Sequence, residues 1–213
     1  MDGMSITKVS TTKFLGVTID DGLTWNNHNN NVANIVSKYS GILYRLKHSL
    51  PANALFTIYN TLVLPHLQYC NIIWADANNC KLSNVHIRQK RIIRLCTNAG
   101  WYQHSSPLFY KLSTLTVYDI HKLQTAIFMY NFINNNLPVN FDNYFVMNTS
   151  IHSYGTRCSN ELRPVAFNTN LAINSIRNQG PKLWNGIAND IINSPTNNVF
   201  KRKYKRLLLS MYH

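Results

Sequence analysis

The sequence predicts a mainly helical protein that begins with a small β-hairpin. Three observations support this fold class. Apolar residues recur at helical spacing over several long stretches, a segment rich in β-branched and aromatic residues precedes them, and Pro or Asn residues stand where helices are expected to start or end. With 213 residues, 45% of them hydrophobic, the chain is long enough to bury a sizeable core, as one domain or as two small ones.

The hairpin is expected over residues 5–19. Ile6 and Val9 belong to its first arm, and the run from Phe14 to Ile19 forms the second. Asp2-Gly3 is a turn signal with too few residues before it to form a strand, so we expect the chain to begin within a domain.

Helical periodicity follows the hairpin. Thr24 is a candidate N-cap of the first helix, Pro51 opens the second, and Pro65 kinks or ends it before a separate helical piece over 66–74. The apolar residues expected to face inward in these two helices are Val32, Ile35, Val36, Tyr39, Ile42, Leu43, Leu46, Leu55, Ile58, Tyr59, Leu62 and Val63.

Further helices are expected over about 81–97, 106–112 and 116–133, the last opened by a capping box of Thr116 and Asp119. Alternation of Leu171, Ile173 and Ser175 with polar neighbours suggests a short strand, Pro181 opens another helix, and the last helix covers about 197–212. These elements divide the chain into a hairpin at 1–22, a helical region at 23–138 and a small α+β C-terminal module at 139–213.

The charge balance is strongly basic. Lys and Arg number 21 against eight acidic residues, which gives a formal net charge of +13. Such an excess favours a polyanionic partner, nucleic acid or an anionic membrane face, over a merely solvated basic surface. No apolar run of about 20 residues is present, so we do not expect a membrane span.

Asp20 and Asp21 could be a metal-binding pair or a turn. Neighbouring residues of a strand point to opposite faces, and a third carboxylate would have to come from one of the scattered remaining acids. Asp-Asp-Gly between a strand and a helix is ordinary turn chemistry, so we favour the turn. The four cysteines and the histidines show no metal-ligand spacing either, and we expect no catalytic residue, no metal site and no cofactor.

Two clusters of cations are the candidate contacts to a nucleic-acid backbone, although each could equally be a solvated helix face. The first comprises Lys81, Arg88, Lys90, Arg91 and Arg94, and the second Lys201, Arg202, Lys203, Lys205 and Arg206. Arg177 and Lys182 flank Gly180 and could bind phosphate or make structural bonds. Trp101, Tyr102 and Trp184 could stack on bases, although the apolar side of its helix favours a core position for Trp184.

Several blocks resemble the C-terminal part of jockey-like non-LTR retrotransposon reverse transcriptases, in the same order. They are T-K-F-L-G-V-T-I-D-D-G-L-T-W-N-N-H at 12–28, G-I-L-Y-R-L at 41–46, I-Y-N-T-L-V-L-P-H-L-Q-Y-C at 58–70, Q-K-R-I-I-R-L at 89–95, H-S-Y-G-T-R at 152–157, S-I-R-N-Q-G-P-K-L-W-N at 175–185 and F-K-R-K-Y-K-R-L-L at 200–208. The resemblance implies the end of the palm, the thumb and the C-terminal region.

The family's catalytic aspartates lie in an aromatic-Ala-Asp-Asp turn upstream of the F-L-G-V strand, and that segment does not occur in this sequence. The resemblance therefore implies a fragment that is no enzyme on its own and that binds RNA or an RNA–DNA duplex; Mg²⁺ would serve only the missing palm. A structural remnant without independent activity is the alternative. The missing palm segment or other copies of the chain are further expected partners, and the expected location is nuclear.

Overall fold

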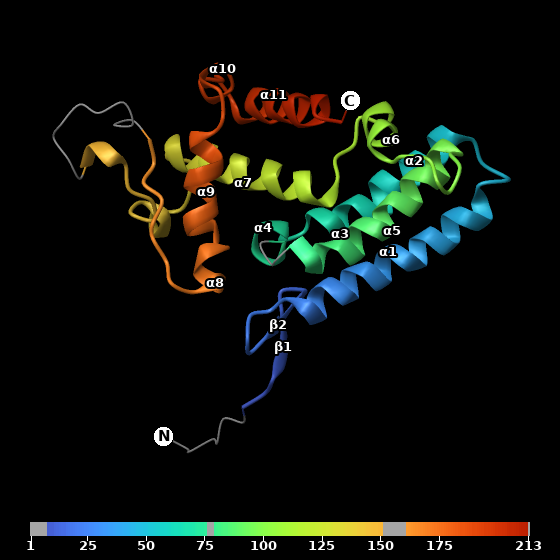
Figure 1. Ribbon diagram of the computed structural model, residues 1–213, viewed down its shortest axis with the longest axis horizontal. Helices are drawn as coiled ribbons and strands as arrows, with labels where there is room; N and C mark the ends of the chain where they lie inside the picture. The colour runs from blue at the N-terminus through green and yellow to red at the C-terminus, as the bar shows by residue number, and fades with distance from the viewer. Residues whose placement is uncertain (1–7, 76–78, 151–160, 213) are drawn as a thin grey trace.

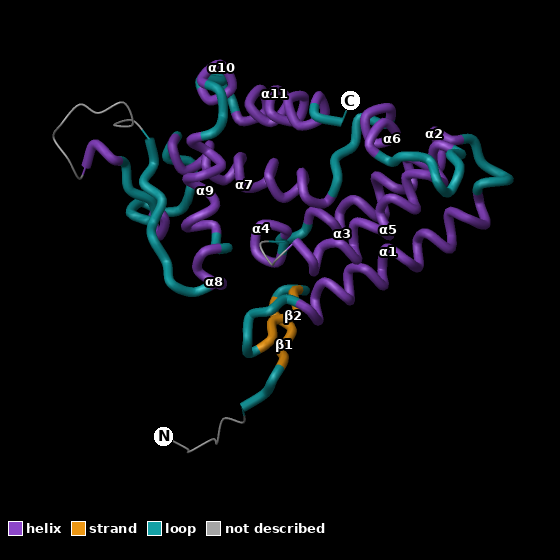
Figure 2. Tube along the Cα trace, in the orientation of Figure 1, coloured by secondary structure: helices purple, strands orange, loops and turns teal. Residues whose placement is uncertain are grey.

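The computed structural model describes residues 8–75, 79–150 and 161–212, and it is mainly helical with one two-stranded antiparallel sheet (Figures 1 and 2). The predicted fold class, a helical bundle with a small N-terminal hairpin, is confirmed. Within the described ranges, no helix combines the length and the apolar character needed to cross a membrane.

The hairpin pairs β1 (Thr11–Phe14) with β2 (Val17–Asp20), with Phe14 opposite Val17. Its turn is therefore Leu15-Gly16, and the prediction that Phe14 opens the second arm is wrong. Both turn residues have positive φ, 46° and 83°, as a two-residue hairpin turn requires. Leu rarely adopts such a φ, so Leu15 is not recognisable as a hairpin-turn residue from its type. Ile6 lies outside the described residues.

Two long helices, α1 (Asn26–Leu46) and α5 (Asn79–Thr97), pack along each other (Figure 1). Their apolar stripes form one wall of the core. Val32, Val36 and Leu43 of α1 are buried as predicted, and Leu82, Val85, Ile92 and Cys96 of α5 are buried with them. Ile42 is exposed, contrary to prediction, because it lies at the edge of the α1 stripe. Trp25 occupies the N-cap position in place of the predicted Thr24.

The second predicted helix is a chain of shorter segments: α2 (Ala52–Ile58), the π-helical η1 (Tyr59–Val63), α3 (Leu64–Gln68) and, after a break, α4 (Asn71–Trp74). Pro65 has no N–H to donate, and the π-helical turn stands directly before it. The predicted distortion at Pro65 is thus confirmed. The π-turn also rotates the face of the helix, which leaves Leu62 exposed although it was expected inside.

Two further helices follow, α6 (Ser106–Lys111) and α7 (Val117–Ile133). The predicted cap is present, because the Asp119 N–H donates to the Thr116 hydroxyl at 3.3 Å. Buried Gln89 of α5 ties this corner together. Its amide nitrogen donates to the Tyr59 hydroxyl and the Leu115 carbonyl, and its oxygen accepts from the Val117 N–H, each at 2.9 Å.

In the described C-terminal segments, the regular elements are helices joined by loops, beside an isolated β-bridge between Met147 and Leu162. They comprise η2 (Val139–Phe141), η3 (Asn148–Ser150), α8 (Asn170–Ile173), α9 (Ile176–Asn185), α10 (Asn189–Ile192) and α11 (Asn197–Ser210).

Two predictions for this module are wrong. Where a strand was predicted from Leu171 to Ser175, the chain forms α8, because the Thr169 hydroxyl caps a helical turn by accepting from the Ala172 N–H. Pro181 does not open a helix but lies inside α9, which starts at Ile176.

Both α9 and α11 pack on α7, which runs through the middle of the molecule (Figure 1). Tyr130 of α7 stacks on Phe200 of α11 with ring centroids 4.6 Å apart, and its hydroxyl donates to the Ser194 carbonyl at 2.7 Å. Gly180 lets α9 approach α7 closely, since a Cβ there would lie 2.7 Å from the Met129 sulfur. The domain limits at 22 and 138 stay predictions.

Candidate nucleic-acid interface

Asp20 is a structural carboxylate at the junction between β2 and α1. Its two oxygens accept from the backbone N–H groups of Thr24 and Trp25, at 2.8 and 2.9 Å. Burial acts to raise the pKa of Asp20, but these hydrogen bonds outweigh it and hold the pKa below its ordinary value.

The arrangement does not suit the Mg²⁺ that a polymerase palm holds. Both Asp20 oxygens already serve the backbone, and Asp21 is exposed. Among the residues that the structure describes, no three His, Cys, Asp or Glu side chains gather as a metal-ligand group. The Asp-Asp-Gly segment is thus built as a turn, as the sequence indicated.

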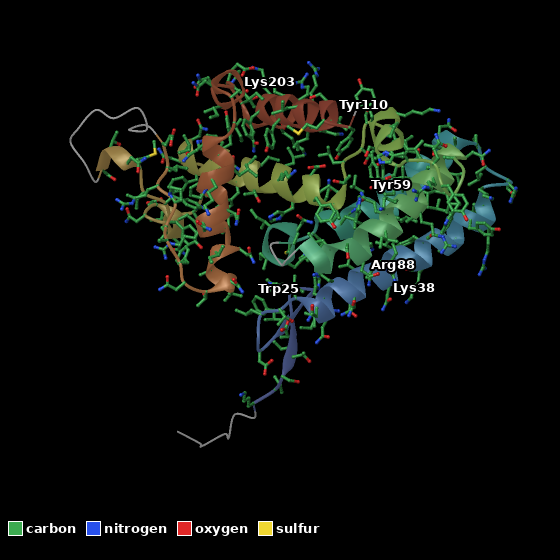
Figure 3. The ribbon with its side chains drawn as sticks, in the orientation of Figure 1. Trp25, Lys38, Tyr59, Arg88, Tyr110 and Lys203 are labelled. Atoms are coloured by element: carbon green, nitrogen blue, oxygen red, sulfur yellow. The ribbon has the colours of Figure 1, made fainter. Side chains whose placement is uncertain are left out.

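The cations of α5 differ in how exposed they are. Arg91 is exposed, Arg88 and Arg94 are half-buried, and Lys90 is half-buried beside the ring of His86. The Lys81 side chain lies outside the described residues. The Arg88 guanidinium donates to the Ser37 hydroxyl of α1 at 2.6 Å, which places it next to Lys38 (Figure 3). Arg94 donates to the Gln103 carbonyl at 3.1 and 3.2 Å.

A polar groove of about 440 Å³ lies between the hairpin, α1 and α3. Lys13 of β1, Lys38 of α1 and His66 of α3 contribute its basic groups, and no carboxylate lines it. Its floor is fixed, because the Tyr69 hydroxyl donates to the Leu15 carbonyl at 2.6 Å and the Thr18 N–H donates to His28 Nδ1 at 3.3 Å. Sequence reasoning missed this groove, since Lys13, Lys38 and His66 come from three separate segments.

We call the combined region the α1–α5 basic surface, and it consists of Lys13, Lys38, Arg88, Arg91 and Arg94. Neither α1 nor α5 contains an Asp or Glu. The exposed side of α1 instead carries Asn27, Asn30, Asn31 and Asn34, which are neutral donors and acceptors. The region therefore presents positive charge without an opposing carboxylate on either helix.

The second predicted cluster lies elsewhere. On α11, Lys201, Arg202, Lys203 and Arg206 are exposed, whereas Lys205 is half-buried. Burial and then the nearby charge of Lys201 lower the pKa of Lys205. The Lys203 ammonium donates to the Asp190 carbonyl at 2.8 Å. Lys203 and Arg88 lie on opposite sides of α7 (Figure 3), so the structure does not bring the two clusters together.

The remaining candidates, two cations of α9 and three aromatic residues, also differ in their surroundings and exposure. The Arg177 guanidinium lies 5.7 Å from the centre of the Tyr144 ring, and Lys182 is exposed. Trp184 is buried against Phe200, which confirms the expected core position, whereas Trp101 and Tyr102 are exposed. Only the last two aromatic candidates are therefore accessible to a base.

A larger cavity of about 710 Å³ lies between the start of α1, α4 and the C-terminal module. Trp25, Ile72, Phe128 and Leu171 are among its lining residues, and none of the lining side chains is charged. It is chemically unlike the basic groove and does not extend the surface described above.

A comparison with curated proteins finds a relative of this chain. Over 112 residues, half of its length, the chain is 30% identical to a probable RNA-directed DNA polymerase from transposon X-element of Drosophila melanogaster. The match covers 12% of that protein's length. No protein-family profile and no solved structure matches the chain. The similarity supports a relation to transposon-encoded RNA-directed DNA polymerases.

Proposed function

We propose that this chain is the thumb and C-terminal part of a jockey-like non-LTR retrotransposon reverse transcriptase, and that it binds the sugar–phosphate backbone of RNA or of an RNA–DNA duplex. The observation that carries the proposal is the α1–α5 basic surface. It combines five cations from the hairpin and from two packed helices, and neither helix contains an Asp or Glu. The similarity to a transposon polymerase supports the choice of nucleic acid over other polyanions.

The binding is electrostatic and independent of sequence. Guanidinium and ammonium groups displace the counterions condensed on phosphates, so affinity falls steeply as salt rises. The Arg88 guanidinium donates to the Ser37 hydroxyl beside Lys38, and Lys13 and Lys38 line one groove, so the fold brings these three cations near one another. Helix α11 and its Lys203 lie across α7 from Arg88 (Figures 1 and 3), so we treat the exposed cations of α11 as a second, separate surface.

The role we assign is binding without catalysis. Polymerisation, and the Mg²⁺ it needs, belong in this proposal to a palm that carries the catalytic aspartates. Such a palm, or a second copy of this chain, would be its protein partner, and the nucleus, where chromosomal DNA lies, its place of action.

The test is the salt dependence of duplex binding. Fluorescence anisotropy with a labelled RNA–DNA duplex, from roughly 50 to 200 mM KCl, should show an affinity loss of about 10³- to 10⁵-fold if six to ten phosphates are contacted. Lys13→Gln/Lys38→Gln/Arg88→Gln should flatten the slope of log affinity against log salt by about 2 to 3. Circular dichroism checks that the variant keeps its helices.

The matched variant Lys201→Gln/Arg202→Gln/Arg206→Gln removes the same charge from α11. It should change the slope less, because these cations lie on the other side of α7. Affinity that ignores salt, or a slope that the first triple variant leaves unchanged, would refute the proposed surface. Absence of any duplex binding would favour a structural remnant without independent activity.

A further inference from the structure

Two large aromatic side chains stand in solvent between α5 and α6. Tyr102 is 97% exposed and Trp101 is 65% exposed. The other three tryptophans differ, since Trp74 and Trp184 are buried and Trp25 is half-buried. Neither exposed ring fills the core, so packing does not explain why two large aromatic side chains stand at this position.

Hydrogen bonds define the conformation of the segment that carries these rings. Asn98 leaves the helix at φ 52°, and the Ala99 N–H donates to the Arg94 carbonyl at 3.0 Å. The Gln103 N–H then donates to the Gly100 carbonyl at 3.1 Å, which closes a turn around Trp101 and Tyr102. Arg94 fixes the far end of this turn through two bonds to the Gln103 carbonyl. The rings are thus presented by an ordered turn.

Positive charge borders the same turn. The Arg91 guanidinium lies 5.7 Å from the centre of the Trp101 ring, which is within range of a cation–π contact. From residue 77 to residue 118 the sequence contains six Lys or Arg residues and no Asp or Glu. Any ligand that covers these rings therefore meets cations, and a ligand with regularly spaced anionic groups fits best.

We infer that Trp101 and Tyr102, flanked by Arg91 and Arg94, form a stacking platform for the unpaired bases of a single-stranded nucleic acid. We call it the α5–α6 platform; the inference rests on the proposed nucleic-acid binding and deepens it. The faces of bases are accessible in a single strand but are covered by their neighbours within a duplex. Stacked bases bring phosphates alongside, where Arg91 meets them.

With this platform, two regions along α5 bind different forms of nucleic acid. Arg88, with Lys13 and Lys38, receives a duplex backbone near the hairpin end of the surface. The turn beyond the C-terminal end of α5 receives a strand that has left the duplex. A nucleic acid with a single-stranded overhang then contacts both regions and binds more tightly than the blunt duplex.

The test uses intrinsic fluorescence and a single-stranded oligothymidylate of about twelve nucleotides, a length within the usual site size of single-strand binders. Stacking should quench the emission of Trp101, which is the exposed tryptophan of the described residues. Tyr102→Ala should weaken oligothymidylate binding by about 5- to 30-fold, as loss of one stacked base predicts, and leave blunt-duplex affinity within about twofold.

Tyr44→Ala is the matched control. Tyr44 is an exposed tyrosine of α1 that also lies beside a cation, Lys47, at 4.8 Å. This variant should bind both oligonucleotides as the wild type does. Trp101→Phe, which keeps a ring, should retain most of the affinity while the quenching signal disappears.

The outcomes separate the two proposals. Duplex binding with no Trp101 quenching, or with Tyr102→Ala indistinguishable from Tyr44→Ala on the single strand, overturns the platform and leaves the backbone surface intact. Failure to bind either nucleic acid overturns both, and the rings would then be free for a protein partner. Selective loss of single-strand affinity in Tyr102→Ala establishes the platform.

Discussion

At the scale of single residues, Asp20 shows how the backbone can occupy a carboxylate that looks catalytic in the sequence. It closes the turn between β2 and α1 by accepting from two consecutive N–H groups, those of Thr24 and Trp25. Its neighbour Asp21 is exposed to solvent. The two carboxylates are adjacent in sequence yet have different roles, and this difference can be tested directly.

Asp20→Ala should lower the free energy of unfolding by about 2–3 kcal/mol, because two charge-assisted bonds to the backbone are lost. Asp21→Ala should change it by less than about 0.5 kcal/mol. Because the pKa of Asp20 is depressed in the folded state, its contribution is present above the ordinary carboxyl pKa of about 3.9 and is lost as pH falls through the folded value. Urea denaturation of both variants checks this, and equal losses would contradict the assigned role.

His86 is the residue that should make the protein sensitive to mild acid. Burial, and then the charge of Lys90, lower the pKa of His86 to about 4. The ring stacks on Phe109 and meets Tyr118 edge-on, so the packing favours a neutral ring. A depressed histidine pKa means that stability is full above about pH 6.5 and is lost as pH falls toward 4.

The loss over that window should be about 2–3 kcal/mol. His86→Phe keeps the stacked ring and cannot titrate, so its unfolding free energy should fall less between pH 6.5 and 4. His48→Gln, a change at an exposed histidine, should follow the wild type. A pH profile that is the same for all three proteins would refute the assignment.

At the scale of elements, the long amphipathic helices could be predicted and the short segments could not. A stripe of apolar residues over 19 to 21 positions, as in α5 and α1, repeats often enough to exclude a strand. The alternation from Leu171 to Ser175 covers less than two helical turns, so periodicity alone cannot separate strand from helix. The cap from Thr169 decides in favour of α8.

The junction between α7 and α9 depends on the absence of a side chain. A Cβ at Gly180 would lie 2.7 Å from the Met129 sulfur and 3.5 Å from the Phe145 ring. Gly180→Val should therefore destabilise the protein by about 1–3 kcal/mol through overpacking, despite the better helix propensity of Val.

Gly41 provides the matched control for this change. It also lies inside a helix, but a Cβ there would meet nothing within 4 Å. Gly41→Val should be neutral or slightly stabilising in urea denaturation, since Val is a better helix former than Gly. If both variants behave alike, the close approach of α9 to α7 is not what Gly180 provides.

At the scale of the whole molecule, the basic character of the candidate site could be predicted from composition, but its layout could not. Arg88, Arg91 and Arg94 follow one another on α5, so their cluster is visible in the sequence. Lys13 and Lys38 join them only because the hairpin packs against α1, which no local pattern encodes. The same folding separates the α11 cations from them.

The net charge of +13 makes salt act on stability and on binding in opposite directions. Eight carboxylates cannot pair with 21 Lys and Arg side chains, so like charges repel one another across the folded surface. Raising NaCl from roughly 50 to 500 mM shortens the Debye length to a few ångströms and should raise Tm by several degrees. Over the same range, the affinity for a duplex should fall.

Lys201→Gln/Arg202→Gln/Arg206→Gln supplies the control, because it lowers the formal charge from +13 to +10 by removing three cations. Its Tm at low salt should lie above that of the wild type, and its response to NaCl should be weaker. Calorimetry on both proteins, at low and high NaCl, measures these Tm values. A wild-type Tm that falls with NaCl would mean that attractive pairs, such as Lys122 with Asp119 at 2.9 Å, outweigh the repulsion. The excess of positive charge would then not destabilise the folded state.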